Sequence, residues 1–61
     1  MWIISKESAT NTDHLAWLGK CNGAVVGAFA DGTETNITLA RDYDKIMQAI
    51  KDGEDYVEVS L

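Results

Sequence analysis

The chain has 61 residues and a formal net charge of −5, from five basic and ten acidic side chains. So short a chain forms a single domain over residues 1–61, buries only about 60% of the surface of its unfolded form, and leaves little room for an enzyme's machinery. Its negative field disfavours nucleic-acid backbones and anionic membranes as direct partners.

The first third of the chain contains short segments of different character. Trp2–Ile4 is rich in β-forming residues and is predicted as a strand. The polar stretch 8–13 is predicted as a turn. Two structures, a strand and a short helix, are compatible with segment 14–20. Its alternation of larger and smaller side chains favours a strand, whereas Thr12 and Gly19 suit the two ends of a short helix.

The clearest strand pair is formed by residues 24–30 and 33–39, joined at Asp31-Gly32. An Asp-Gly pair between strand-like runs predicts a two-residue type I′ turn with positive φ at both positions. Asn22-Gly23 predicts a second hairpin turn, and Gly27 marks a bulge or a close approach. Alternation along the second strand predicts one face with Thr33, Thr35, Ile37 and Leu39, and another with Glu34, Asn36 and Thr38.

A helix is predicted between Asp42, a candidate N-cap, and Gly53, which suits the position after its end. Its apolar residues recur at helical spacing and predict a buried stripe of Tyr43, Ile46, Met47 and Ile50. A last strand over 56–61 would place Val57, Val59 and Leu61 on one side. The predicted class is therefore α+β: a small antiparallel β-meander with one helix packed on a sheet face and a C-terminal strand.

Residues that could carry catalysis or bind a metal are scarce. Cys21 is the only cysteine and His14 the only histidine, so an intrachain disulfide and a four-ligand zinc site are excluded. Their odd spacing puts them on opposite faces of a strand, which disfavours a nucleophile–base pair and leaves a small buried thiol and an exposed imidazole. No phosphate loop, dinucleotide fingerprint or metal-ligand cluster occurs. We expect no catalytic site, metal or cofactor, and a small core without crosslinks favours a homo-oligomer.

A few polar and aromatic residues are candidates for binding. Arg41, the sole arginine, stands where the helix begins, and its guanidinium together with the helix amides suits a phosphate or carboxylate. The alternative, which these residues favour, is an exposed arginine that pairs with Asp44 or Asp42 in solvent. Trp2 and Trp17 could stack on a planar ligand, or could belong to the core or to a subunit interface. The candidate ligand-binding residues are Arg41, Lys45, Trp2, Trp17, Asn36 and Thr38.

Nothing in the sequence has the pattern of a signal peptide or a membrane span, and the free cysteine fits a reducing compartment, so a cytoplasmic location is expected. The opening Met1-Trp2-Ile3, the 24–33 hairpin and the helix with Tyr43 and Ile46 resemble a group of short proteins encoded by phages and mobile elements. These proteins begin Met-Trp-Ile or Met-Trp-Val. The resemblance implies a phage-type accessory protein that acts in the host cytoplasm, where interference with host defence is common.

Two function hypotheses follow. The first is a non-enzymatic, homo-oligomeric binding protein that sequesters a small anionic ligand between subunits, such as a signalling nucleotide of host antiviral defence. The alternative is a protein–protein inhibitor of a host defence or nucleic-acid-binding protein, of the anti-CRISPR or anti-restriction type. In that version an acidic surface covers a basic one, although the carboxylates are spread along the chain and only Asp52, Glu54 and Asp55 form a tight group. A structural or regulatory subunit without a ligand is also compatible with these residues.

Overall fold

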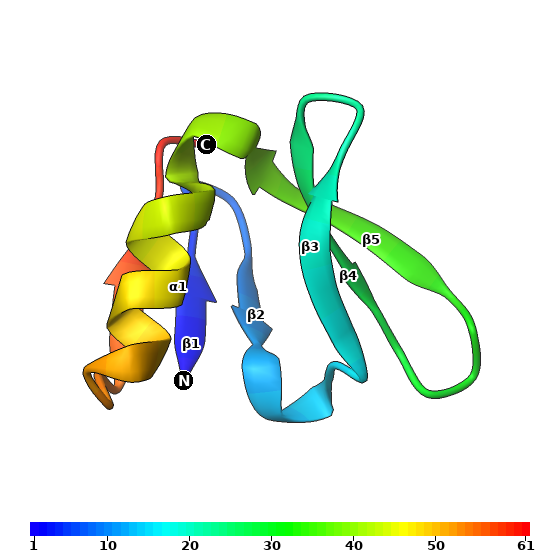
Figure 1. Ribbon diagram of the computed structural model, residues 1–61, viewed down its shortest axis with the longest axis horizontal. Coiled ribbons are helices and arrows are strands. Elements are labelled where there is room, and N and C mark those ends of the chain that lie inside the picture. The colour runs from blue at the N-terminus through cyan, green and yellow to red at the C-terminus, as the bar shows by residue number, and fades with distance from the viewer.

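The computed structural model describes residues 1–61 and has an α+β architecture, which confirms the predicted class (Figure 1). Strands β3 (Trp17–Cys21), β4 (Ala24–Ala28) and β5 (Glu34–Leu39) form an antiparallel meander, followed by one helix and a C-terminal strand. In chain order the elements are β1 (Trp2–Ile4), β2 (Ala9–Asn11), the 3₁₀ turn η1 (Thr12–His14), β3 (Trp17–Cys21), β4 (Ala24–Ala28), β5 (Glu34–Leu39), the 3₁₀ turn η2 (Ala40–Asp42), α1 (Tyr43–Lys51) and β6 (Tyr56–Glu58).

A second three-stranded sheet, in the order β2-β1-β6, accompanies the meander. Its central strand β1 pairs antiparallel with β2 and parallel with β6, with Trp2 opposite Tyr56. The prediction of a turn over 8–13 is therefore wrong for Ala9–Asn11, which is a strand. Because β2 is an edge strand with no buried residue, its polar composition gave no alternating signal.

Segment 14–20 contains the start of a strand, as its alternation favoured, and no α-helix. The predicted turn at Asn22-Gly23 is confirmed, since both residues have positive φ, 51° and 81°. This turn connects β3 to β4 in register, from Trp17 opposite Ala28 to Cys21 opposite Ala24.

The connection between β4 and β5 is longer than the predicted two-residue turn. Phe29 N–H donates to the Thr33 carbonyl at 2.8 Å, so the loop between them has three residues, and only Gly32 among them has a positive φ, 93°. Such a loop is typical of a type I turn followed by a bulge at a left-handed glycine. The Asp31 carboxylate accepts the Thr33 N–H at 3.0 Å and also the Thr33 hydroxyl. These bonds lower the pKa of Asp31 and make the aspartate side chain part of the turn.

A register shift breaks the predicted alternation of β5. Val25 lies opposite Thr38 while Val26 lies opposite Asn36, so Ile37 is an extra residue in the ladder. Ile37 and Thr38 are consequently both buried, and the next residue, Leu39, is exposed.

Of the two alternatives predicted for Gly27, a bulge or a close approach, the structure shows the close approach. A Cβ atom placed there would lie 2.9 Å from Leu15 Cδ2 and 3.1 Å from Ile37 Cδ1. The glycine therefore lets the segment before β3 pack directly on the meander.

The helix ends as predicted, in a Schellman motif. Gly53, at φ 72°, donates to the Ile50 carbonyl at 3.2 Å, and Glu54 donates to the Ala49 carbonyl at 3.0 Å. Its buried stripe is displaced from the prediction, since Ile46 and Ala49 are buried whereas Ile50 is 40% exposed.

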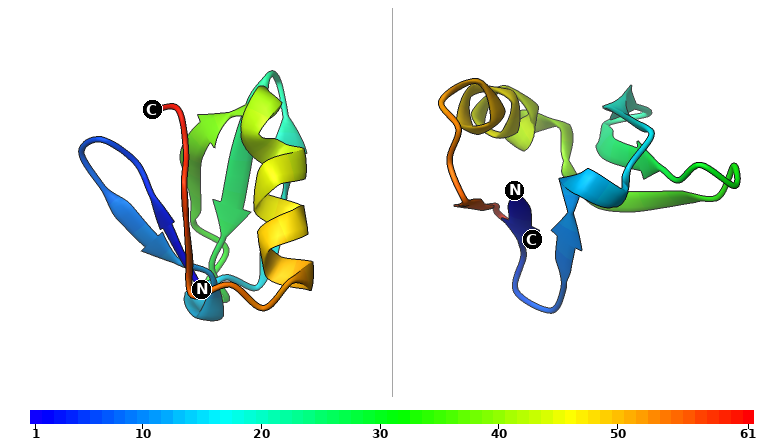
Figure 2. Two further views of the ribbon diagram at one scale, coloured as in Figure 1. Left: turned by 90° about the vertical axis from the view of Figure 1, so that its left-hand side faces the viewer. Right: turned by 90° about the horizontal axis from the view of Figure 1, so that it is seen from below.

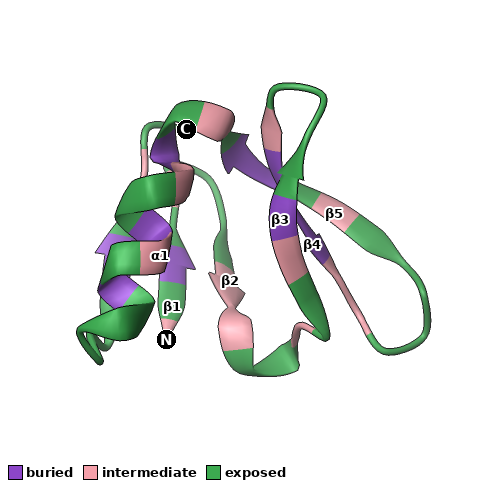
Figure 3. Cartoon of the chain, viewed as in Figure 1, coloured by how far each residue is buried: buried purple, intermediate pink, exposed green.

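The core lies between α1 and the two sheets, and its members come from five different elements (Figures 1 and 2). Figure 3 shows the buried positions on both sheets and on the helix, with exposed hairpin tips. In β6 only Val57 is buried; Val59 is intermediate and Leu61 is exposed, which corrects the predicted apolar face of 56–61. The buried cluster consists of Ile3, Val25, Ile37, Ile46, Ala49 and Val57.

Candidate functional site

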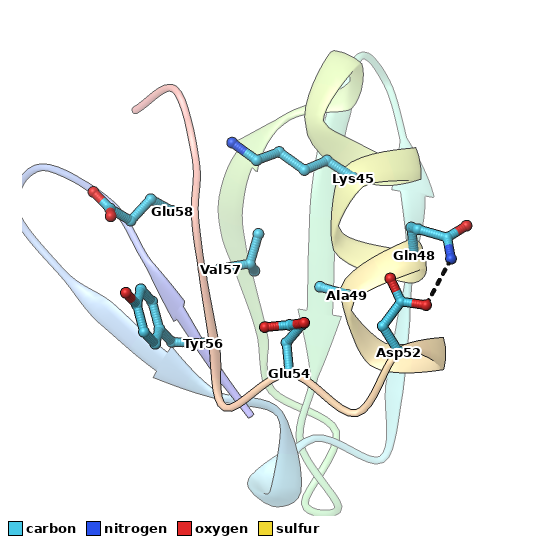
Figure 4. Close-up of a pocket in the computed structure, with 8 residues that line it drawn as sticks. All are labelled: Lys45, Gln48, Ala49, Asp52, Glu54, Tyr56, Val57 and Glu58. Carbon is cyan, nitrogen blue, oxygen red and sulfur yellow. Dashed lines mark hydrogen bonds between the residues drawn. The ribbon is translucent and has the colours of Figure 1, made fainter.

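The largest concavity is a groove of about 580 Å³ between α1 and β6 (Figure 4). The helix contributes one wall, the strand contributes the other, and the turn that joins them closes one end. Ala49 and Val57, both buried, contribute apolar atoms to the groove. The groove residues are Lys45, Gln48, Ala49, Asp52, Glu54, Tyr56, Val57 and Glu58.

The charges around this groove are unequal. One cation, Lys45, and three carboxylates, those of Asp52, Glu54 and Glu58, belong to residues that line the groove, which gives a net charge of −2. The Glu58 side chain is directed to the far face of the sheet, so Asp52 and Glu54 are the carboxylates on the helix side (Figure 4). One carboxylate is already held in place, since Gln48 Nε2 donates to Asp52 Oδ1 at 3.0 Å. The groove is therefore suited to a cationic group above an apolar floor.

Strand β6 is an edge of its sheet, and it borders the groove, whose lining includes Tyr56, Val57 and Glu58. Trp2 N–H donates to the Asp55 carbonyl at 2.9 Å, and Val59 N–H donates to the Ile4 carbonyl at 3.0 Å, so the odd-numbered residues of this stretch bond to β1. Main-chain groups alternate in direction along a strand. The N–H and C=O groups of Tyr56 and Glu58 therefore point away from β1.

Beyond the C-terminal end of β6, the outward-facing groups of Ser60 are already bonded to Asp42. Its carboxylate accepts the Ser60 N–H at 3.0 Å, the Ser60 hydroxyl at 3.0 Å and the Thr38 hydroxyl at 2.7 Å. The Thr38 bond is the main reason that the pKa of Asp42 is lowered, with help from Ser60 and from the charge of Arg41 and against the effect of burial. Asp42 stands at the predicted N-cap position but makes no side-chain cap bond, because its carboxylate joins β5 to the C-terminal segment instead.

The sheet face opposite the helix carries exposed aromatic side chains. Trp2 and Tyr56 lie side by side in register on β1 and β6, and are 47% and 56% exposed. Ile4, two residues along the same face, is also exposed. Figure 4 shows the Tyr56 and Glu58 side chains directed to this side and Val57 directed toward the helix.

The structure does not gather the six predicted ligand residues into one pocket. Lys45 lines the α1–β6 groove, whereas Trp17 lines a separate, apolar depression of about 250 Å³. Arg41 and Asn36 are exposed on η2 and β5 and line neither, and Trp2 is half-exposed on β1.

Thr38, another of the predicted ligand residues, takes part in a hydrogen bond that joins two parts of the fold. It is 2% exposed, and its hydroxyl is used by Asp42. Cys21 is exposed, which corrects the expectation of a buried thiol.

Sequence reasoning missed most of the groove. Besides Lys45, the close spacing of Asp52, Glu54 and Asp55 was the only signal, and two of these three acidic residues do line the groove. Tyr56 and Glu58 gave no signal, because their place in the groove depends on how β6 pairs with a strand at the opposite end of the sequence.

No group of three or more His, Cys, Asp or Glu side chains is arranged to hold a metal ion. The single α-helix has neither the length nor the apolar character to cross a membrane. No family model, no curated protein and no solved structure matches this chain.

Proposed function

We propose that the protein is a non-enzymatic protein-binding module that takes a basic segment of a partner protein into the α1–β6 groove. The observation that carries this proposal is the imbalance of charge around an apolar floor, with three carboxylates and one lysine. Electrostatic complementarity of this kind gives partner selectivity and fast association. It supports the second of the two function hypotheses, in which an acidic surface covers a basic one.

A small anionic ligand has weaker support. Of the cations predicted to contact phosphate, Lys45 stands beside carboxylates and Arg41 lines no pocket, while the hydroxyl of Thr38 is occupied. An anion in the groove would meet repulsion from Asp52 and Glu54 on its helix side. The phage-type setting, with a host defence or nucleic-acid-binding protein as the partner, rests on the sequence resemblance.

Binding of a basic peptide tests the proposal. The probe is a fluorescein-labelled, acetylated octapeptide that alternates lysine and threonine, followed by fluorescence anisotropy. We expect binding that weakens several-fold when the salt is raised from about 50 to about 300 mM, because screening shortens the range of charge attraction.

Charge-removing variants locate the binding. The double variant D52N/E54Q, which neutralises the two carboxylates on the helix side of the groove, should weaken binding by about tenfold, which corresponds to about 1.4 kcal/mol. A matched control, E34Q/D44N, removes the same charge from exposed positions outside the groove. Equal weakening by the two variants would show that net charge alone attracts the peptide and would contradict the proposal, as would the absence of binding.

The competing hypothesis has its own test in the same preparation. Thermal unfolding is followed with and without a panel of mono- and cyclic nucleotides, since a ligand that binds the folded state raises the midpoint. A rise with any nucleotide would favour the anionic ligand over the basic segment.

A further inference from the structure

We infer that the basic segment binds as an extended strand, paired through its main chain to the free edge of β6. This inference rests on the proposed function and concerns the same groove. It adds the conformation of the bound segment and the pattern of its side chains.

The edge offers unpaired hydrogen-bonding groups at the groove. Tyr56 and Glu58 each direct one N–H and one C=O away from β1, and no side chain of the protein bonds to these groups. An unpaired edge of this kind is a template for an added strand, in which main-chain bonds supply affinity and side-chain pockets supply specificity.

Ser60 shows how this edge behaves when an acceptor is present. It is the next residue in the same outward-facing series, and the Asp42 carboxylate accepts both its N–H and its hydroxyl, at 3.0 Å each. The outward donor of Ser60 therefore reaches an acceptor at the residue that precedes α1. Because this contact closes one end and the turn at Gly53 closes the other, the open edge is limited to the stretch around Tyr56 and Glu58.

The two faces of β6 dictate which side chains the added strand must carry. Figure 4 shows Val57 directed toward α1, with Tyr56 and Glu58 on the opposite face. Neighbouring strands lie about 4.8 Å apart, and their side chains alternate between the same two faces. Side chains at every second position of the added strand would therefore face Asp52 and Glu54, and those between would lie beside Tyr56 and Glu58.

The predicted partner segment therefore has lysine or arginine at alternate positions, separated by β-forming residues. The cationic side chains meet the carboxylates on the helix side of the groove. The separating residues pack beside the aromatic ring of Tyr56, which is 56% exposed in the free protein.

Peptides N-methylated at alternate amides test the pairing on the unaltered protein. Two versions of the lysine–threonine octapeptide are compared with the parent, one methylated at every lysine amide and the other at every threonine amide. Since only one edge of a strand pairs, one version should lose at least about tenfold in affinity and the other should stay within about threefold of the parent.

A pair of protein variants tests the same edge from the other side. E58P removes the outward N–H and the charge, whereas E58Q removes the charge alone. Proline is tolerated in an edge strand where its nitrogen faces solvent, and far-UV circular dichroism checks that both variants fold. We expect E58P to bind the parent peptide at least about fivefold more weakly than E58Q, because one main-chain bond is lost as well.

Each outcome has a distinct meaning. Selective loss by one methylated peptide, together with the difference between E58P and E58Q, supports the added strand. Equal affinity of all three peptides would overturn it while leaving salt-dependent binding, and hence the proposed function, in place. Equal loss by both methylated peptides would also overturn it, and no binding of the parent peptide would remove the proposed function itself.

Discussion

Asp42 is the residue whose removal we expect to destabilise the fold most clearly. Its carboxylate accepts three hydrogen bonds, one from Thr38 and two from Ser60, and it is 6% exposed. It thereby ties β5 to the segment that follows β6. Substitution by alanine breaks all three bonds and leaves the Thr38 hydroxyl, 2% exposed, without a partner.

The magnitude follows from the number and kind of these bonds. A hydrogen bond to a charged group contributes about 1.5–3 kcal/mol, the three are not additive, and a buried hydroxyl without a partner costs about 1–3 kcal/mol. We expect D42A to lower the free energy of unfolding by about 3 kcal/mol. A domain of this size has a total of about 3–9 kcal/mol, so the loss would be a third or more of the whole stability.

Urea unfolding followed by far-UV circular dichroism measures this loss. For so small a domain the slope is about 1 kcal/mol per molar urea, so the midpoint should fall by about 3 M. D44A is the matched control, because Asp44 is also acidic and in the first turn of α1 but is exposed, and its loss should cost under about 0.5 kcal/mol.

The double variant D42A/T38V gives the sharpest check on the reasoning. In the native background T38V removes a bonded hydroxyl and should cost about 1 kcal/mol, whereas in the D42A background it removes an orphaned one and should be neutral or stabilising. Equal costs of T38V in the two backgrounds, or a cost of D42A under about 1 kcal/mol, would refute the account of this cluster.

Three further predictions concern other measurements on the fold. The pKa of Asp42 is lower in the folded state than its ordinary value of 3.8, so the stability that this group contributes is complete above that pH and is lost as the pH falls through the folded-state pKa. As the pH is lowered, the free energy of unfolding should therefore fall less steeply for D42N than for the native protein, and equal slopes would contradict this. G27A should cost about 1–3 kcal/mol in urea unfolding, because the new methyl group would lie 2.9 Å from Leu15 and 3.1 Å from Ile37; a neutral effect would show that both can move aside. G53A should cost about 1 kcal/mol of helix stability because of the positive φ there, 72°, and unchanged thermal unfolding would contradict this.

Much of the fold could be predicted because its signals are local. The glycine at the helix end, the Asn22-Gly23 turn and the β-rich opening each depend on a few neighbouring residues. Asp31-Gly32 correctly predicted a hairpin. The loop has three residues instead of the predicted two, and the Asp31 side chain stabilises it by bonding to Thr33. Local chemistry thus located the turn and misjudged only its length.

The remaining features are non-local. The extra residue at Ile37 follows from how β4 and β5 pair, and no property of β5 alone distinguishes it from a regular strand. The parallel pairing of β1 with β6 leaves no periodic signature linking the two segments. The groove depends on that pairing, so sequence analysis found its acidic residues without their arrangement.

The pairing of Trp2 with Tyr56 has a consequence for how the chain acquires its structure. The hairpins of the meander join neighbours in sequence, whereas this contact joins residues that are 54 positions apart. Contacts between such distant residues form slowly. A folding intermediate in which β6 has not yet paired would therefore have a hairpin of β1 and β2 whose inner strand is open on one side, and neither the groove nor its pairing edge would yet exist.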